Sequence, residues 1–71
     1  MRPFSDIHIG DIYASPLYWT GSDIVYEVIN KDKDSKMIEI RSSYQHPALP
    51  ETIWKRQSDR IFNRRIHSSK I

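Results

Sequence analysis

The chain has 71 residues, of which 38% are hydrophobic and 28% charged, and a net charge of +2 at pH 7. This length accommodates one small domain with a limited core, and the composition is that of a folded chain rather than a disordered one. The absence of cysteine excludes both disulfide bridges and thiolate metal sites.

The charges are unevenly distributed along the chain. Residues 1–54 contain 5 Lys and Arg against 8 Asp and Glu, whereas residues 55–71 contain 6 Lys and Arg against one Asp. An asymmetry of this kind is typical of a segment that meets an anionic partner. No apolar run approaches the roughly 20 residues of a membrane-spanning helix, and the first residues lack the apolar core of a signal peptide. We therefore expect a soluble, cytoplasmic protein without a membrane partner.

The first predicted element is an edge-like strand over residues 7–14, IHIGDIYA, with a bend or bulge at Gly10. Its alternation predicts that Ile7, Ile9 and Tyr13 are buried. A loop with turn-forming residues, SPLYWTGSD, follows this strand.

The centre of the chain predicts a β-hairpin. Residues 23–30, DIVYEVIN, are rich in the β-branched and aromatic side chains that strands favour. Residues 37–44, MIEIRSSY, alternate so that Ile38 and Ile40 point toward the core. The charged segment KDKDSK at residues 31–36 has the composition of a solvated turn between the two strands.

The last elements are short. Residues 52–56, TIWKR, predict a strand, and Ser58 is the candidate N-cap of a single helical or 3-10 turn over residues 58–62. A further strand is expected around residues 64–66, and residues 67–71 are expected to fray.

Together these elements predict a mainly β fold, a small and partly open barrel of four or five short antiparallel strands with one single turn of helix near residues 58–62. The chain forms one domain, residues 1–71, with its ordered core over about residues 7–66. Two other architectures fit the same pattern, namely a β-meander packed on a C-terminal helix over residues 57–66 and an OB-like barrel.

The order of elements resembles that of SH3-like barrels, in which strands alternate with a long irregular loop, a charged turn, a second loop and a 3-10 turn. The corresponding segments are IGDIY, ASPLYWTGS, DIVYEVIN, KDKDS, KMIEIRSS, YQHPALPE, TIWKR, SDRIF and NRRI. A weaker similarity, over about residues 7–66, is to small bacterial domains of unknown function with a YEV strand and a late W…R…F segment, here Trp54, Arg56 and Phe62. The resemblance implies a fold rather than an activity. The acid-free loop over residues 15–22 departs from SH3 domains that bind proline-rich peptides.

The sequence predicts no enzyme, no metal site and no cofactor. The three histidines, His8, His46 and His67, do not have the spacing of a ligand pair, and no cysteine assists them. No G-x-S-x-G nucleophile motif is present, and two isolated glycines cannot form a phosphate-binding loop.

The strongest functional signal is the basic segment over residues 54–65. Its cations can neutralise phosphates, and aromatic side chains among them can stack on unpaired bases. The alternative is that Trp54 and Phe62 belong to the core and that the arginines form a solvated rim paired with the acidic first half of the chain. The predicted residues for binding nucleic acid or another anion are Trp54, Lys55, Arg56, Arg60, Arg64 and Arg65.

A second hypothesis is a protein partner that docks on Tyr18, Trp19 and the edge strand, because an exposed tryptophan in a loop favours an interface. The alternative is that Leu17 and Trp19 fold back over one end of the barrel. An acidic protein surface could also occupy the basic segment, as could the target of an inhibitory adaptor, and self-association is compatible with so small a core. We therefore expect a small, non-enzymatic binding module.

Overall fold

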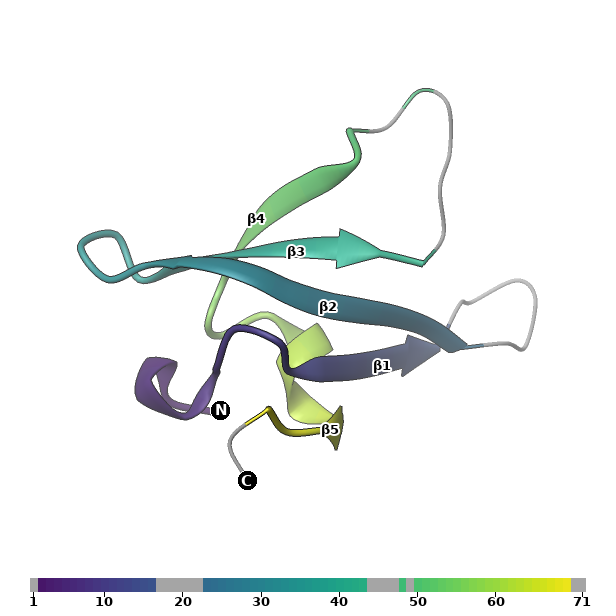
Figure 1. Cartoon of the computed structure of the whole chain (residues 1–71), viewed down its shortest axis with the longest axis horizontal. Helices are drawn as coiled ribbons and strands as arrows, with labels where there is room; N and C mark the ends of the chain where they lie inside the picture. Colours follow the sequence, from purple (N-terminus) through teal and green to yellow (C-terminus); the bar gives the residue numbers. More distant parts are fainter. Residues whose placement is uncertain (1, 17–22, 44–47, 49, 70–71) are drawn as a thin grey trace.

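The computed structural model describes residues 2–16, 23–43, 48 and 50–69. In this part of the chain five antiparallel strands form one sheet in the order β4-β3-β2-β1-β5 (Figure 1). The strands are β1 (Ile12–Pro16), β2 (Asp23–Asp32), β3 (Met37–Ser42), β4 (Thr52–Arg56) and β5 (Arg65–His67), and the 3-10 turns are η1 (Phe4–Asp6) and η2 (Arg60–Asn63). The sheet bends without closing, so the predicted mainly β, partly open small barrel is confirmed. Within these residues no helix is long and apolar enough to cross a membrane.

The hairpin of β2 and β3 is the longest paired unit of the sheet. The two strands pair in register except for one extra residue in β2, which forms a bulge between Val28 and Asn30. After the bulge, Lys31 lies opposite Ile38, so its side chain belongs to the inner face of the sheet. β2 continues to Asp32, two residues beyond the predicted strand, because pairing with β3 extends past the apolar pattern.

The core lies on the inner face of the sheet, beneath η2. Its buried residues are Ile7, Tyr13, Val28, Ile38, Ile40, Ile61 and Phe62. The rings of Tyr13 and Phe62 meet edge to face with their centroids 5.2 Å apart, an arrangement that stabilises aromatic pairs. The predicted burial of Ile7, Tyr13, Ile38 and Ile40 is confirmed.

The predicted strand over residues 7–14 is wrong in two respects. β1 begins only at Ile12, and Ile9, expected to be buried, is 57% exposed. The reason is a turn at Gly10, whose φ of +96° is accessible to glycine at little cost, and which directs Ile9 out of the core. β1 is also not an edge strand, because β5 pairs with it on the side away from β2.

The turn η2 begins one residue later than predicted. Asp59, not Ser58, is its N-cap, and the Asp59 carboxylate accepts a hydrogen bond of 3.1 Å from the N–H of Ile61. Burial of Ile61 and Phe62 fixes the position of the turn, and the residue before Arg60 then has to cap it. The alternative of a helix over residues 57–66 is wrong, since this segment contains the 3-10 turn η2 and the start of β5.

We expect Ile40→Val to lower the free energy of unfolding by about 0.5–1.5 kcal/mol, because it removes a methyl group from a fully buried side chain. Ile66 on β5 is 52% exposed, and Ile66→Val deletes the same group at a change of less than about 0.5 kcal/mol. Urea unfolding followed by tryptophan fluorescence measures both variants. Equal losses would contradict the assignment of Ile40 to the core.

Candidate functional site

The predicted basic segment is divided by the alternation of β4. Lys55 lies opposite Ile38 and so shares the inner face of the sheet, where its ammonium group is 3.8 Å from the Asp59 carboxylate. Trp54 and Arg56 belong to the outer face, and both are exposed. The Trp54 side chain, 43% exposed, is therefore a surface residue, and it has an arginine two positions away on the same face.

Arg65 belongs to an internal ion network rather than to the outer surface. Its guanidinium donates to the backbone C=O of Asp6 at 2.7 Å and to the Asp11 carboxylate at 3.3 Å. The Arg65 side chain is 21% exposed, and the Asp11 side chain is fully buried. The positive charge of Arg65 is thus compensated within the fold, and β5, which carries it, is the edge of the sheet opposite to β4.

The Asp11 carboxylate is the centre of this network. It accepts hydrogen bonds from the backbone N–H groups of His8 and Ser69, both at 2.9 Å, and from the Tyr13 hydroxyl at 3.1 Å. Burial by itself would raise the pKa of Asp11, but these hydrogen bonds, together with the one from Arg65, outweigh burial and lower the pKa below its usual value. Asp11 is therefore an ionised, fully satisfied structural group.

Tyr13 completes the network as a hydrogen-bond donor. Burial, followed by the negative charge of Asp11, raises the pKa of Tyr13 to about 12. The hydroxyl stays protonated at neutral pH and continues to donate to Asp11. This part of the protein thus serves stability and offers no activated nucleophile.

The remaining predicted cations are exposed. Arg56 ends β4, Arg60 opens η2, and Arg64 follows that turn. In the part of the chain that the structure covers, the side chains of Arg56 and Arg60 form no ion pair. Trp54, Arg56, Arg60 and Arg64 are called the basic rim below.

Lys36 lines a groove together with Arg56, although the sequence pattern assigns it to a solvated turn, and its ammonium group lies 5.1 Å from the centre of the Phe4 ring. An open groove of about 550 Å³ lies between the β2–β3 turn and the segment after β4, lined by Ser35, Lys36, Met37, Arg56, Gln57 and Ser58. Met37 pairs with Arg56, so the preceding residue, Lys36, reaches the end of β4. The pairing of the two predicted strands is the signal from which this proximity could have been found.

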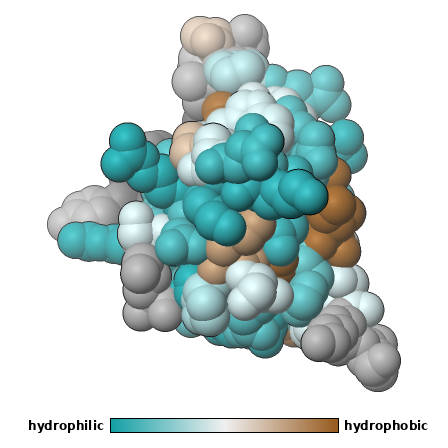
Figure 2. All heavy atoms as spheres, turned by 90° about the vertical axis from the view of Figure 1, so that its left-hand side faces the viewer, coloured by the Kyte–Doolittle hydropathy of each residue, from teal (hydrophilic) through white to brown (hydrophobic). Residues whose placement is uncertain are grey.

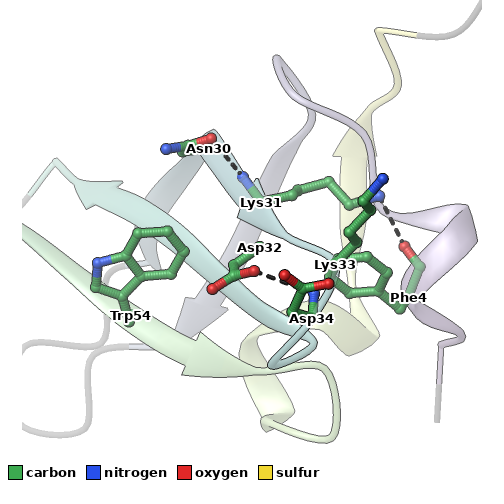
Figure 3. A pocket seen from close by; sticks show the side chains of 7 residues that line it. All are labelled: Phe4, Asn30, Lys31, Asp32, Lys33, Asp34 and Trp54. Carbon is green, nitrogen blue, oxygen red and sulfur yellow. Dashed lines mark hydrogen bonds between the residues drawn. The ribbon is translucent and has the colours of Figure 1, made fainter.

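On its other side Trp54 adjoins a groove of mixed charge. This groove of about 650 Å³ is lined by Phe4, Trp54 and residues 30–34 (Figure 3). Asp32 and Asp34 lie between the Trp54 and Phe4 rings, and the Asp32 carboxylate accepts a hydrogen bond of 3.0 Å from the N–H of Asp34. Lys31 and Lys33 line the same groove, and Glu39 lies opposite Trp54 on β3, so charges of both signs lie beside Trp54. The groove at the end of β4, in contrast, is lined by cations and by no acid.

Lys31 holds η1 against the hairpin. Its ammonium group donates to the C=O of Phe4 at 2.9 Å and lies 4.2 Å from the centre of the Phe4 ring. Burial lowers the pKa of Lys31. Lys31 is thus engaged within the fold, while the end of the molecule around the turn is covered mainly by other hydrophilic side chains (Figure 2).

The predicted partner-binding residues and one of the three histidines cannot be placed in the structure. Tyr18 and Trp19, the predicted partner-binding residues, lie outside the residues that the structure describes, as does His46. His8 and His67 are described, and no group of three or more His, Asp or Glu side chains in the covered ranges could hold a metal ion.

Comparison of the chain with models of protein families, with curated proteins and with solved structures found no match. The similarity to SH3-like barrels therefore rests on the order of the elements. A function has to be argued from the geometry and charge of the surface.

We expect Asp11→Asn to lower the free energy of unfolding at pH 7 by about 1.5–3 kcal/mol, because it removes charge-assisted hydrogen bonds and the counterion of Arg65. The folded-state pKa of Asp11 lies below the ordinary value of 3.8. The contribution of the carboxylate is therefore complete above about pH 4 and is lost as the pH falls through the folded-state pKa. Urea unfolding over a pH series should show this acid-dependent loss in the wild type, and a smaller one in the variant.

Asp6→Asn is the matched control. The Asp6 side chain is 44% exposed and pairs with Arg2 at 2.7 Å and, at the longer distance of 3.6 Å, with Arg65. Loss of these partly exposed pairs should cost less than about 1 kcal/mol. Equal stability of the Asp6→Asn and Asp11→Asn variants would refute the central position of Asp11.

Proposed function

We propose that the protein is a non-enzymatic binding module that binds single-stranded nucleic acid on the basic rim. The observation that carries this proposal is the pair of exposed side chains of Trp54 and Arg56 on the outer face of β4. An exposed indole offers a stacking surface to an unpaired base, and neighbouring arginines neutralise phosphates and release their counterions.

The charged side chains around Trp54 indicate where on the surface the ligand would lie. The groove on the β2 side of Trp54 is lined by Asp32 and Asp34 but also by Lys31 and Lys33, so it offers phosphates no net positive charge. A nucleic-acid strand that meets Trp54 would therefore extend toward the end of β4, where Lys36 and Arg56 line a groove without an acid, and occupy only a few nucleotides.

An SH3-like layout fits this proposal, because small barrels of this type serve as scaffolds for many unrelated binding functions. An acidic protein surface would meet the same cations. An unpaired base would in addition stack on the exposed indole, which contributes about 1–3 kcal/mol. This difference makes Trp54 the residue that separates the two kinds of partner.

Binding can be measured by fluorescence anisotropy with a labelled oligothymidylate of about 10 nucleotides, at about 50 and 200 mM salt. We expect clear binding at the lower salt concentration. Arg56→Ala should weaken it and reduce the slope of log K against log salt by about 0.7, since one phosphate contact is lost. Trp54→Ala should weaken binding by about fivefold or more without a change of slope.

Arg41→Ala is the matched control, because it removes one exposed cation from β3, opposite Thr52 at the start of β4. It should leave the affinity and the slope near those of the wild type. The proposal fails if no binding occurs at the lower salt concentration or if Arg41→Ala and Arg56→Ala weaken binding equally. Tight binding of polyglutamate that Trp54→Ala does not affect would indicate an acidic protein partner instead.

A further inference from the structure

β4 is an open edge of the sheet. It pairs with β3 on one side, and no strand in the described ranges pairs with its other side (Figure 1). Edge strands are commonly protected by short length, proline, bulges or inward-pointing charges, because their free N–H and C=O groups can pair with another strand. β5, at the opposite edge, has three residues, whereas β4 has five, without proline and with a continuous register. The inward-pointing charge of β4, Lys55, is paired with Asp59.

The register shows which backbone groups of β4 point away from β3. The N–H of Ser43 donates to the C=O of Val25 at 2.8 Å, so the odd-numbered residues of β3 bond toward β2 and the even-numbered ones toward β4. Ile40 is even-numbered and pairs with Ile53. The residue on each side of Ile53, including Trp54, therefore directs its N–H and C=O to the open side.

The two ends of β4 carry opposite charges. Glu51 precedes the strand with a side chain that is 75% exposed, and its contact with Arg41 is long, at 3.9 Å. Arg56 ends the strand and is exposed. If a second β4 aligned antiparallel, Trp54 would face its own counterpart, and the acidic start of each strand would lie beside the basic end of the other. Cross-strand aromatic pairs and opposite charges both stabilise such a pairing.

We propose that two copies of this chain associate through β4 in antiparallel orientation about a two-fold axis, so that their sheets become one continuous sheet. The two indoles would lie side by side on the outer face, flanked by the two basic rims. The association does not require nucleic acid and goes beyond the binding function proposed above. The contact involves a five-residue strand from each copy, so association is expected to be weak and to depend on protein concentration.

Sedimentation velocity of the whole chain, from about 10 µM to about 1 mM, tests this association. We expect the sedimentation coefficient to rise toward that of a dimer. Trp54→Lys places like charges opposite each other at the centre of the contact and should raise the concentration at half-association at least tenfold. Ile66→Lys makes the same kind of change at an exposed position of β5 and should have no effect. A monomer at all concentrations, or equal effects of both variants, would overturn the proposal.

An exchange of charges provides a second test of the antiparallel association, and this test does not depend on whether Trp54→Lys folds. Glu51→Arg and Arg56→Glu should each weaken self-association several-fold, because like charges then meet across the axis. An equimolar mixture of the two variants should associate again, since each acid then meets an arginine of the other chain. A mixture that stays monomeric would overturn the antiparallel arrangement.

The same variants separate this proposal from the nucleic-acid proposal. Glu51→Arg leaves every residue of the basic rim in place, so it should weaken self-association without weakening oligonucleotide binding. An intact dimer that binds no oligonucleotide would refute the binding function alone.

Discussion

The fold depends on one buried negative charge. The Asp11 carboxylate receives hydrogen bonds from the turn before β1, from the neighbouring Tyr13, from Arg65 on β5 and from Ser69 beyond it. A chain of 71 residues without cysteine has a small core and no covalent cross-link. The carboxylate connects residues 58 positions apart in the sequence, and it fastens the last strand to the rest of the sheet. Because every partner is satisfied, this buried charge stabilises the fold instead of straining it.

Contacts within the fold determine which charges reach the surface. Arg65 is held inside, and Lys55 and Lys31 are engaged with Asp59 and Phe4. The cations of the C-terminal segment that remain exposed therefore lie around η2 and at the end of β4. The groove on the other side of Trp54 contains acids and lysines together. The groove at the end of β4 is lined by Lys36 and Arg56 and by no acid, so a chain with little net charge presents a local positive surface there.

Strands with a period of two were predictable because alternation records which face is buried. The bounds of β4, residues 52–56, agree with the prediction, and Ile38 and Ile40 lie in the core as their spacing indicates. Alternation wrongly predicted that Ile9 is buried, because Gly10, with its positive φ, interrupts the strand with a turn. Alternation alone does not show such an interruption, and local pattern carries no information on contacts between residues far apart in the sequence.

For that reason the contacts of the candidate site were less predictable than its residues. The meeting of Arg65 with Asp11 depends on how β5 closes against β1, and the proximity of Lys36 to Arg56 depends on the pairing of β3 with β4. Residue type indicated that arginines and a tryptophan occur together in residues 54–65. It could not indicate that strand alternation would assign Lys55 to one face and its neighbours to the other.

The long span of the Asp11 hydrogen bonds also bears on how the chain folds during synthesis. The partner at position 69 is made 58 residues after the carboxylate, and protein synthesis proceeds at only about 5–20 residues per second. Until that partner has emerged from the ribosome, the nascent chain contains a carboxylate that favours water over the interior. The β2–β3 hairpin, whose contacts are local, can form earlier, while completion of the sheet has to wait for the last strand. Completion of this sheet is therefore expected only after Ser69 has left the ribosome.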